Sequence, residues 1–208
     1  KVAPISMRIK PGIVAHTHKF IQTGQIDSKF GFALETGEAL SSVKKALQMK
    51  HISLQEFHCH IGSQIFDVKP FVAAAEVMLT FIAEVKRETG VELRELNLGG
   101  GFGIKYVESD EPVSHEEYMK IVSTAVKAKC AELGLTIPTI YMEPGRSIVG
   151  EAGITLYEVG SVKNIPNVRT YVSVDGGMTD NPRYILYQSE YTAVVANKAN
   201  LPADHKVT

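Results

Sequence analysis

A run of glycines that directly follows an apolar, strand-like segment is the first candidate for chemistry. Residues 96–103 read LNLGGGFG. The backbone at Gly99, Gly100 and Gly101 carries no side chains, so its N–H groups could close around an anion such as phosphate. A tight turn between a strand and a loop explains the same run. The spacing of the glycines, with no acidic residue at the required distance, disfavours a dinucleotide site.

A glutamate and an arginine follow a second strand-like segment, where residues 143–146 read EPGR. Parallel barrels place their catalytic groups at the carboxyl ends of the strands. This position makes Glu143 and Arg146 candidates for chemistry. The alternative interpretation is an exposed ion pair in a loop.

Two histidines alternate with a cysteine at the end of a third strand-like segment, where residues 57–64 read FHCHIGSQ. In a strand, His58 and His60 share one face and Cys59 points to the other, so a zinc site that uses all three is disfavoured. A flat ring beside a Gly-Ser turn suits stacking on a planar cofactor. A hydrogen-bonded core histidine is the alternative.

The remaining histidines and cysteines favour neither a metal site nor a disulfide scaffold. His16 and His18 could join His58 and His60 around a metal, but no cysteine spacing supports such a site. Only two cysteines are present, and the chain opens without a charged-then-apolar leader, so we expect a reducing cytoplasm rather than secretion.

A turn-rich segment near the carboxyl end carries further polar groups, since residues 175–184 read DGGMTDNPRY. Its plain interpretation is a connection between two strands. Arg183 and the nearby Tyr187 would then be ordinary surface residues.

Short β-rich runs alternate with amphipathic helical segments up to residue 150, which is the α/β pattern. Ser114 and Glu117 have the spacing of a capping box at a helix start, and Thr36 is a possible N-cap. Strands are predicted over 2–9, 52–60, 93–98 and 139–142, and helices over 36–49, 69–88 and from 114 to about 133.

The pattern changes after Gly150, where strand-like runs follow one another without helices between them. We predict two domains, residues 1–150 and 151–208, the second being all-β. About four strand–helix units fit into the first, whereas a complete parallel barrel needs roughly 250 residues. We therefore expect residues 1–150 to form a partial (β/α) barrel that corresponds to the second half of a complete one. The missing units are expected upstream of Lys1. Strands of the second domain are predicted over 154–163, 168–174, 184–187 and 191–195.

Composition excludes several classes of protein. The 208 residues include 22 Lys and Arg against 23 Asp and Glu, a formal net charge of −1, so no basic field recommends nucleic acid as a partner. No run approaches the roughly 18 apolar residues of a membrane helix. With 44% hydrophobic residues the chain is globular in composition, and a small-molecule partner is the better expectation.

Four motifs in series resemble the diaminopimelate decarboxylase family, which consists of pyridoxal-phosphate enzymes of the alanine-racemase type. They are residues 58–64, 99–103, 143–146 and 174–183. The resemblance runs almost from end to end of the chain. It implies an eight-unit barrel followed by a β-domain, with pyridoxal 5'-phosphate as the cofactor.

The resemblance also implies roles for individual residues. Glu143 matches the carboxylate that pairs with the pyridine nitrogen of the cofactor, and His60 matches the residue that stacks on its ring. The implied phosphate site comprises Ser63, the backbone of Gly99, Gly100 and Gly101, and Gly145 with Arg146. The implied substrate contacts are Arg146, Arg183 and Tyr187.

The implied reaction is decarboxylation of meso-2,6-diaminopimelate to L-lysine by a cytoplasmic homodimer. Other decarboxylases of the same fold, acting on ornithine, arginine or carboxynorspermidine, are alternatives. A non-catalytic pyridoxal-phosphate-binding homologue is a further one, although such proteins commonly lack a β-domain.

Two parts of the family pattern are absent from the chain. One is the Schiff-base lysine of the first barrel strand, which Lys198 imitates in the tripeptide Lys198-Ala199-Asn200 but at the wrong place in the order of motifs. The other is a C-terminal segment with a cysteine and a glutamate, which neither Cys59 nor Cys130 matches. We therefore expect the chain alone to be catalytically silent.

Overall fold

The computed structural model describes residues 1–13, 29–202 and 207. The chain divides into two compact units. The larger unit comprises residues 1–104 and 111–150, and the smaller unit comprises residues 105–110 and 151–208. No helix in the described residues is long and apolar enough to cross a membrane.

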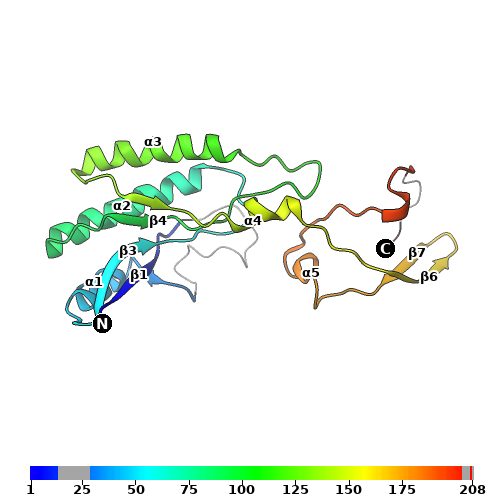
Figure 1. Cartoon of the computed structure of the whole chain (residues 1–208), viewed down its shortest axis with the longest axis horizontal. Helices are drawn as coiled ribbons and strands as arrows, with labels where there is room; N and C mark the ends of the chain where they lie inside the picture. Colours follow the sequence, from blue (N-terminus) through cyan, green and yellow to red (C-terminus); the bar gives the residue numbers. More distant parts are fainter. Residues whose placement is uncertain (14–28, 203–206, 208) are drawn as a thin grey trace. The chain divides into compact units, whose positions relative to one another are not determined.

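A five-stranded sheet, parallel throughout, is the frame of the larger unit (Figure 1). Its order is β2 (Phe32–Ala33), β1 (Ala3–Lys10), β3 (Ile52–His58), β4 (Glu95–Asn97) and β5 (Thr139–Tyr141). The register sets Arg8 opposite His58 and His58 opposite Asn97, which in turn lies opposite Tyr141. All strands therefore end at one edge, and the residues that follow them meet there.

Alternation along the strands separates an apolar face from a polar one. Met7, Phe57 and Leu96 are buried in one core with the apolar stripes of the helices α1 (Glu38–Leu47), α2 (Lys69–Thr89) and α3 (His115–Leu133). The opposite face is hollowed and polar. It is lined by Pro4, Ile5, Ser6, Gln55, Glu56, Glu95, Asn97 and Tyr141.

Local sequence signals set the helix ends. Ser114 caps α3, because its Oγ accepts a hydrogen bond from the Glu117 N–H at 3.2 Å, as the capping-box spacing predicts. The helix α2 ends at Gly90, which adopts the left-handed backbone conformation. The prediction of Thr36 as the N-cap of α1 is wrong by one residue, since Gly37 occupies that position.

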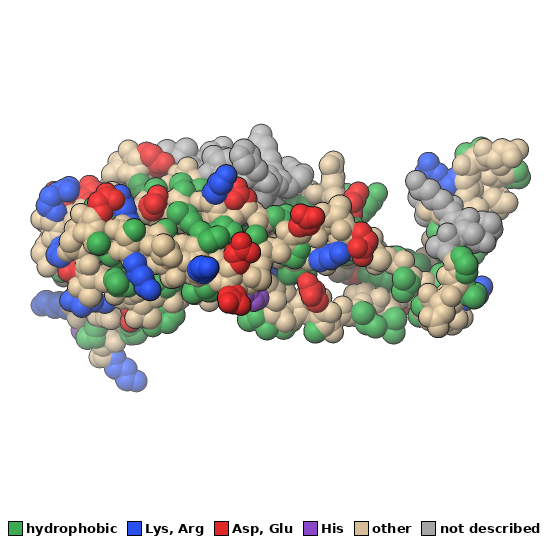
Figure 2. Space-filling model, turned by 90° about the horizontal axis from the view of Figure 1, so that it is seen from above, with side chains coloured by type: hydrophobic (Ala, Val, Ile, Leu, Met, Phe, Trp, Pro, Cys, Tyr) green, Lys and Arg blue, Asp and Glu red, His purple; other side chains and the backbone are tan. Residues whose placement is uncertain are grey.

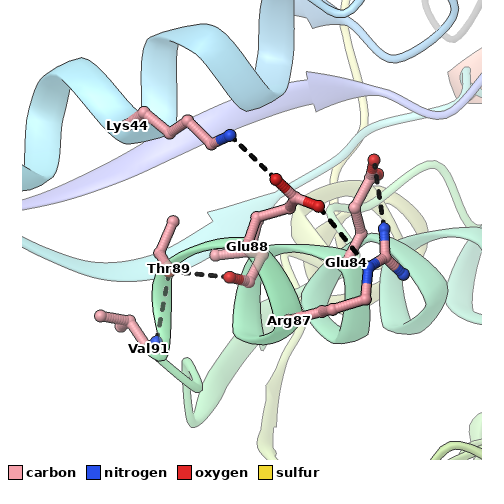
Figure 3. Close-up of polar contacts among 7 residues, drawn as sticks. Lys44, Glu84, Arg87, Glu88, Thr89 and Val91 are labelled. Atoms are coloured by element: carbon pink, nitrogen blue, oxygen red, sulfur yellow. Dashed lines mark hydrogen bonds and ion pairs between the residues drawn. The ribbon is translucent and has the colours of Figure 1, made fainter.

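Apolar packing rather than charge holds α1 and α2 to the sheet. Lys44 Nζ of α1 lies 3.0 Å from Glu88 Oε2 of α2. Figure 3 shows this contact, with Arg87 beside the same carboxylate. Ion pairs exposed in this way contribute only about 0–1 kcal/mol. The ring of Phe81 in α2, by contrast, lies 4.9 Å from that of Phe57 in β3, inside the core. Positive and negative side chains are interspersed on the face of the larger unit seen in Figure 2.

The smaller unit contains an antiparallel hairpin of β6 (Val159–Ile165) and β7 (Arg169–Val174). The predicted strand at 184–187 is wrong, because this segment forms the helix α5 (Arg183–Tyr187). The Asn181 side chain accepts the Arg183 N–H at 3.2 Å and starts the helix, and a short apolar run fits either period. Residues 191–195, also predicted as a strand, lie outside any strand and precede a short 3-10 helix, Ala196–Lys198.

Candidate functional site

A cavity of about 200 Å³ lies where the loops after β3, β4 and β5 meet. It gathers all the residues predicted for the cofactor site except Gly99, which lies directly before Gly100 in the same loop. The lining residues are His60, Ser63, Gly100, Gly101, Phe102, Glu143, Pro144, Gly145, Arg146 and Ser147.

The glycine loop after β4 packs backbone against backbone. The N–H of Glu143 donates to the carbonyl of Gly99 at 2.9 Å. A side chain at Gly100 would collide with the carbonyl oxygen of Glu143, and one at Gly99 with that of Cys59. Gly99 also has a φ of 71°, which favours glycine. The glycines therefore allow three neighbouring loops to approach one another.

Two backbone amides of this loop make hydrogen bonds within the protein, and a third is available to the cavity. Gly99 donates its N–H to Asn97 Oδ1 at 2.8 Å, and Gly100 donates to Nδ1 of His60 at 3.3 Å. These two amides are thus used within the protein rather than aimed at an anion as the sequence predicted. In the described part of the chain the Gly101 N–H donates to no other group, so it is the amide an incoming anion could take.

His60 is a neutral ring at the cavity wall. Because its Nδ1 accepts from Gly100, the proton of the neutral ring lies on Nε2. Burial lowers the pKa of His60, and the positive charge of Arg8 lowers it further. An uncharged, oriented imidazole is suited to packing on a planar partner.

Glu143 is oriented by an amide side chain. Asn97 donates from Nδ2 to Oε1 of Glu143 at 3.1 Å, while its own Oδ1 is fixed by Gly99. Nε2 of His58 lies 3.6 Å from Oε2, which is too long for a hydrogen bond. Burial lowers the pKa of His58 although Glu143 opposes the shift, so this contact is not an ion pair of full charges.

Arg8 places a positive charge at the same edge of the sheet. Its guanidinium carbon lies 4.6 Å from the centroid of the Phe30 ring. Burial lowers the pKa of Arg8, and the negative charge of Glu143 opposes this shift. Composition and motif spacing had not singled out Arg8, because it becomes a neighbour of Glu143 only through the sheet.

Arg146 is held by two consecutive residues of the loop after β3. It lies in the short helix α4 (Gly145–Val149), and it donates from Nη2 to Ser63 Oγ at 2.8 Å and from Nη1 to Gln64 Oε1 at 3.0 Å. A guanidinium next to a hydroxyl is a natural donor set for a phosphate. Gln64 belongs to the quoted motif but had no predicted role.

Cys59 takes no part in this chemistry. Its side chain is completely buried against the helices, and burial raises the pKa of the thiol to about 12. A thiolate is therefore not available at neutral pH. This agrees with the prediction that Cys59 points away from the two histidines.

Arg183 and Tyr187, the other predicted substrate contacts, lie together in the smaller unit. The Arg183 guanidinium carbon is 5.7 Å from the Tyr187 ring centroid, and its Nε donates to the hydroxyl of Tyr191 at 2.9 Å. Among the described residues no three His, Cys, Asp or Glu side chains form a possible metal site. His16 and His18 lie outside those residues.

Comparison with known proteins identifies a family for most of the chain. Residues 1–150 match the family described as "Pyridoxal-dependent decarboxylase, pyridoxal binding domain". The chain is 49% identical to the diaminopimelate decarboxylase of Staphylococcus aureus and 50% identical to that of Bacillus subtilis, over 98% of its length. It spans about half of these relatives, 47% and 46% respectively.

Solved structures agree with this result. A diaminopimelate decarboxylase from M. jannaschii, in complex with L-lysine, matches with a TM-score of 0.80 and 34% identity, over 92% of this chain and 43% of that one. The Helicobacter pylori diaminopimelate decarboxylase, also in complex with L-lysine, matches with a TM-score of 0.77 and 34% identity, over 92% of this chain and 45% of that one. The parallel α/β fold and the match over residues 1–150 lead to one conclusion: the chain belongs to the pyridoxal-dependent decarboxylase family.

Proposed function

We propose that the chain is the part of a diaminopimelate decarboxylase that binds pyridoxal 5'-phosphate. The full-length enzyme would remove carbon dioxide from meso-2,6-diaminopimelate and release L-lysine. The observation that carries this proposal is the convergence of His60, Ser63, Glu143 and Arg146 on one cavity. The names of the relatives, and the L-lysine in three of the matching structures, support the choice of substrate.

The residues of the cavity fit the proposed cofactor. When bound, pyridoxal phosphate supplies a ring that accepts the electron pair left behind by the departing carbon dioxide. Glu143, turned by Asn97, would hold a proton on the ring nitrogen. The neutral ring of His60 would pack on one face of the cofactor. Glu143 and His60 are thus the proposed catalytic pair.

The phosphate end has matching donors. Arg146 offers a guanidinium, and Ser63, whose oxygen already accepts from Arg146, can turn its own proton to the anion. The amide of Gly101 would add a backbone donor. Gly99, Gly100 and Gly145 would contribute by letting the backbone come close rather than by donating.

For the substrate, we infer that Arg146, Arg183 and Tyr187 contact its distal carboxylate and amino group. An arginine can bind a carboxylate with two parallel hydrogen bonds. Residues 1–150 would then be the second half of the barrel and residues 151–208 the beginning of the β-domain, in a homodimeric cytoplasmic enzyme. Lys198, on an exposed 3-10 helix of the smaller unit, would not be the residue that binds the cofactor covalently.

A substrate panel on the full-length protein tests the proposal. We expect release of carbon dioxide and formation of L-lysine from meso-2,6-diaminopimelate, and little turnover of ornithine, arginine or carboxynorspermidine. Borohydride reduction and peptide mapping should label a lysine other than Lys198. Preference for another substrate would contradict the assigned substrate. Cofactor binding with no turnover of any of them would favour a non-catalytic homologue.

A further inference from the structure

Gln64 has an unusual backbone for its residue type. Its φ is 57°, in the left-handed region, which only two other non-glycine residues of the described chain adopt, Asn167 and Gln188. This conformation costs free energy in a residue with a side chain, so the surroundings must hold it in place. The contacts of the Gln64 side chain show which groups hold this conformation in place.

Both ends of the Gln64 side-chain amide make hydrogen bonds. Its Nε2 donates to the carbonyl of Ile104 at 2.7 Å, and its Oε1 accepts from the N–H of Ile104 at 3.2 Å. The same oxygen accepts from Nη1 of Arg146 at 3.0 Å. Turning the amide over would set its NH₂ against two N–H donors, so these partners fix its orientation.

Gln64 and Ser63 together fix the plane of the Arg146 guanidinium. Each accepts from a different terminal nitrogen, Oε1 of Gln64 from Nη1 and Oγ of Ser63 from Nη2. A guanidinium is a rigid planar fork, so two such contacts set its direction as well as its position. The Ile104 contacts anchor this arrangement to the loop after β4. The N–H of the neighbouring Ile65 also joins these two loops, because it donates to the carbonyl of Gly101 at 2.9 Å.

We propose that Gln64 is a positioning residue for the anion site: it aims the Arg146 guanidinium into the cavity without touching the ligand itself. The inference rests on the proposed function, in which the anion is the phosphate of the cofactor. A residue with this role affects recognition of the phosphate and leaves recognition of the pyridine ring, on the side of Glu143 and His60, largely unchanged.

Two substitutions separate the effect of the side-chain amide from the effect of the left-handed backbone. Gln64→Gly removes the side chain and its contacts with Ile104 and Arg146, and it suits the left-handed backbone conformation, so it adds no backbone strain. Gln64→Met keeps the length of the side chain but makes no hydrogen bonds. Because both lack the amide, both should weaken phosphate recognition to a similar degree. Asn167→Gly is the matched control, an amide on left-handed backbone in the β6–β7 turn.

The test is equilibrium binding of pyridoxal phosphate and of pyridoxal, which lacks the phosphate, to the full-length protein. We expect both Gln64 variants to bind pyridoxal phosphate at least about tenfold more weakly and pyridoxal within about twofold of wild type. In an Arg146→Ala background, Gln64→Gly should have little further effect, because the two act as one unit. Competition by inorganic phosphate should weaken in parallel with pyridoxal phosphate binding.

Three results would overturn the inference: equal weakening for both ligands, an undiminished effect in the Arg146→Ala background, or unchanged binding by Gln64→Met. These results differ from a failure of the proposed function. If the wild-type protein bound neither pyridoxal phosphate nor pyridoxal, the proposed function and this inference would both be rejected.

Discussion

Amide side chains hold the two charged groups of the cavity. Asn97 turns the Glu143 carboxylate and Gln64 turns the Arg146 guanidinium. An amide cannot gain or lose a proton near neutral pH, so it keeps its partner in one orientation over a wide pH range. Neither amide could be assigned from the sequence. Their contacts join residues that are 46 and 82 positions apart and exist only in the folded chain.

The first prediction at this scale concerns Glu143. Glu143→Gln keeps the shape of the side chain but removes the charge that would hold a proton on the ring nitrogen. Loss of a charge-assisted hydrogen bond of about 3 kcal/mol corresponds to a fall in kcat of roughly 100-fold. Steady-state kinetics on the full-length enzyme measures it, and Glu116→Gln on the exposed face of α3 is the control. A kcat within twofold of wild type would remove Glu143 from its proposed role.

The second prediction concerns pH. Burial lowers the pKa of His58 and of His60 in the folded chain below the usual value of 6.5. Below pH 6.5 the unfolded chain therefore binds more protons at these sites than the folded chain does. The free energy of unfolding should rise as pH rises from the lowered folded pKa values through 6.5.

Denaturant titrations between about pH 5 and pH 7.5 measure this slope. His60→Gln should flatten part of it, while His51→Gln, at an exposed turn before β3, serves as the control. A free energy of unfolding that fell with pH over this interval would mean that the two histidines are stabilised in their charged form.

At the scale of elements, the sequence predicted most of the larger unit because its signals are local. The cap at Ser114 and the stop at Gly90 depend on near neighbours. The helix α5 was missed because an apolar run of only five residues fits the period of a strand as well as that of a helix. The strand β4 is shorter than predicted, since its pairing ends at Asn97, where the glycine loop begins.

The cap of α3 gives a prediction for a single element. Ser114→Ala removes the acceptor of the Glu117 N–H and should lower the free energy of unfolding by about 1 kcal/mol. Denaturant unfolding measures it. Ser123→Ala, at a half-buried position in the middle of α3, is the control and should cost less. An effect of Ser114→Ala no larger than that of Ser123→Ala would contradict the capping role.

The glycine loop after β4 gives a second prediction for a single element. A methyl group on Gly100 would meet the carbonyl of Glu143, so Gly100→Ala must separate the loops after β4 and β5. We expect pyridoxal phosphate to bind at least about tenfold more weakly to this variant. Gly177→Ala, where a methyl group would meet no atom within 4 Å, should bind it normally. Equal affinity of the two variants would show that close approach of the loops is not required.

At the scale of the whole molecule, the described residues leave apolar side chains and a strand edge uncovered. In the described part of the smaller unit no residue is buried, and large apolar side chains such as Ile154 and Leu156 are 86% and 74% exposed. In the larger unit β5 ends the described sheet with an unpaired edge. Exposed apolar surface and open strand edges favour association.

We therefore predict that the isolated 208-residue chain self-associates and binds a hydrophobic dye. Because Lys198 stands at the wrong place in the order of motifs for the Schiff-base lysine, we also expect the chain to form no L-lysine from diaminopimelate. Light scattering, dye fluorescence and a product assay measure these three properties. A monodisperse monomer that binds no dye would show that these surfaces are satisfied within the chain. Lysine formation would show that the chain contains every group the reaction needs.

The most direct test of the central claim is a crystal structure of the full-length protein with pyridoxal 5'-phosphate. We predict the ring nitrogen within hydrogen-bond distance of the Glu143 carboxylate, the ring against His60, and the phosphate on Ser63 and Arg146 with the Gly101 amide. A cofactor bound elsewhere, or a phosphate away from Arg146 with Glu143 facing solvent, would contradict the account.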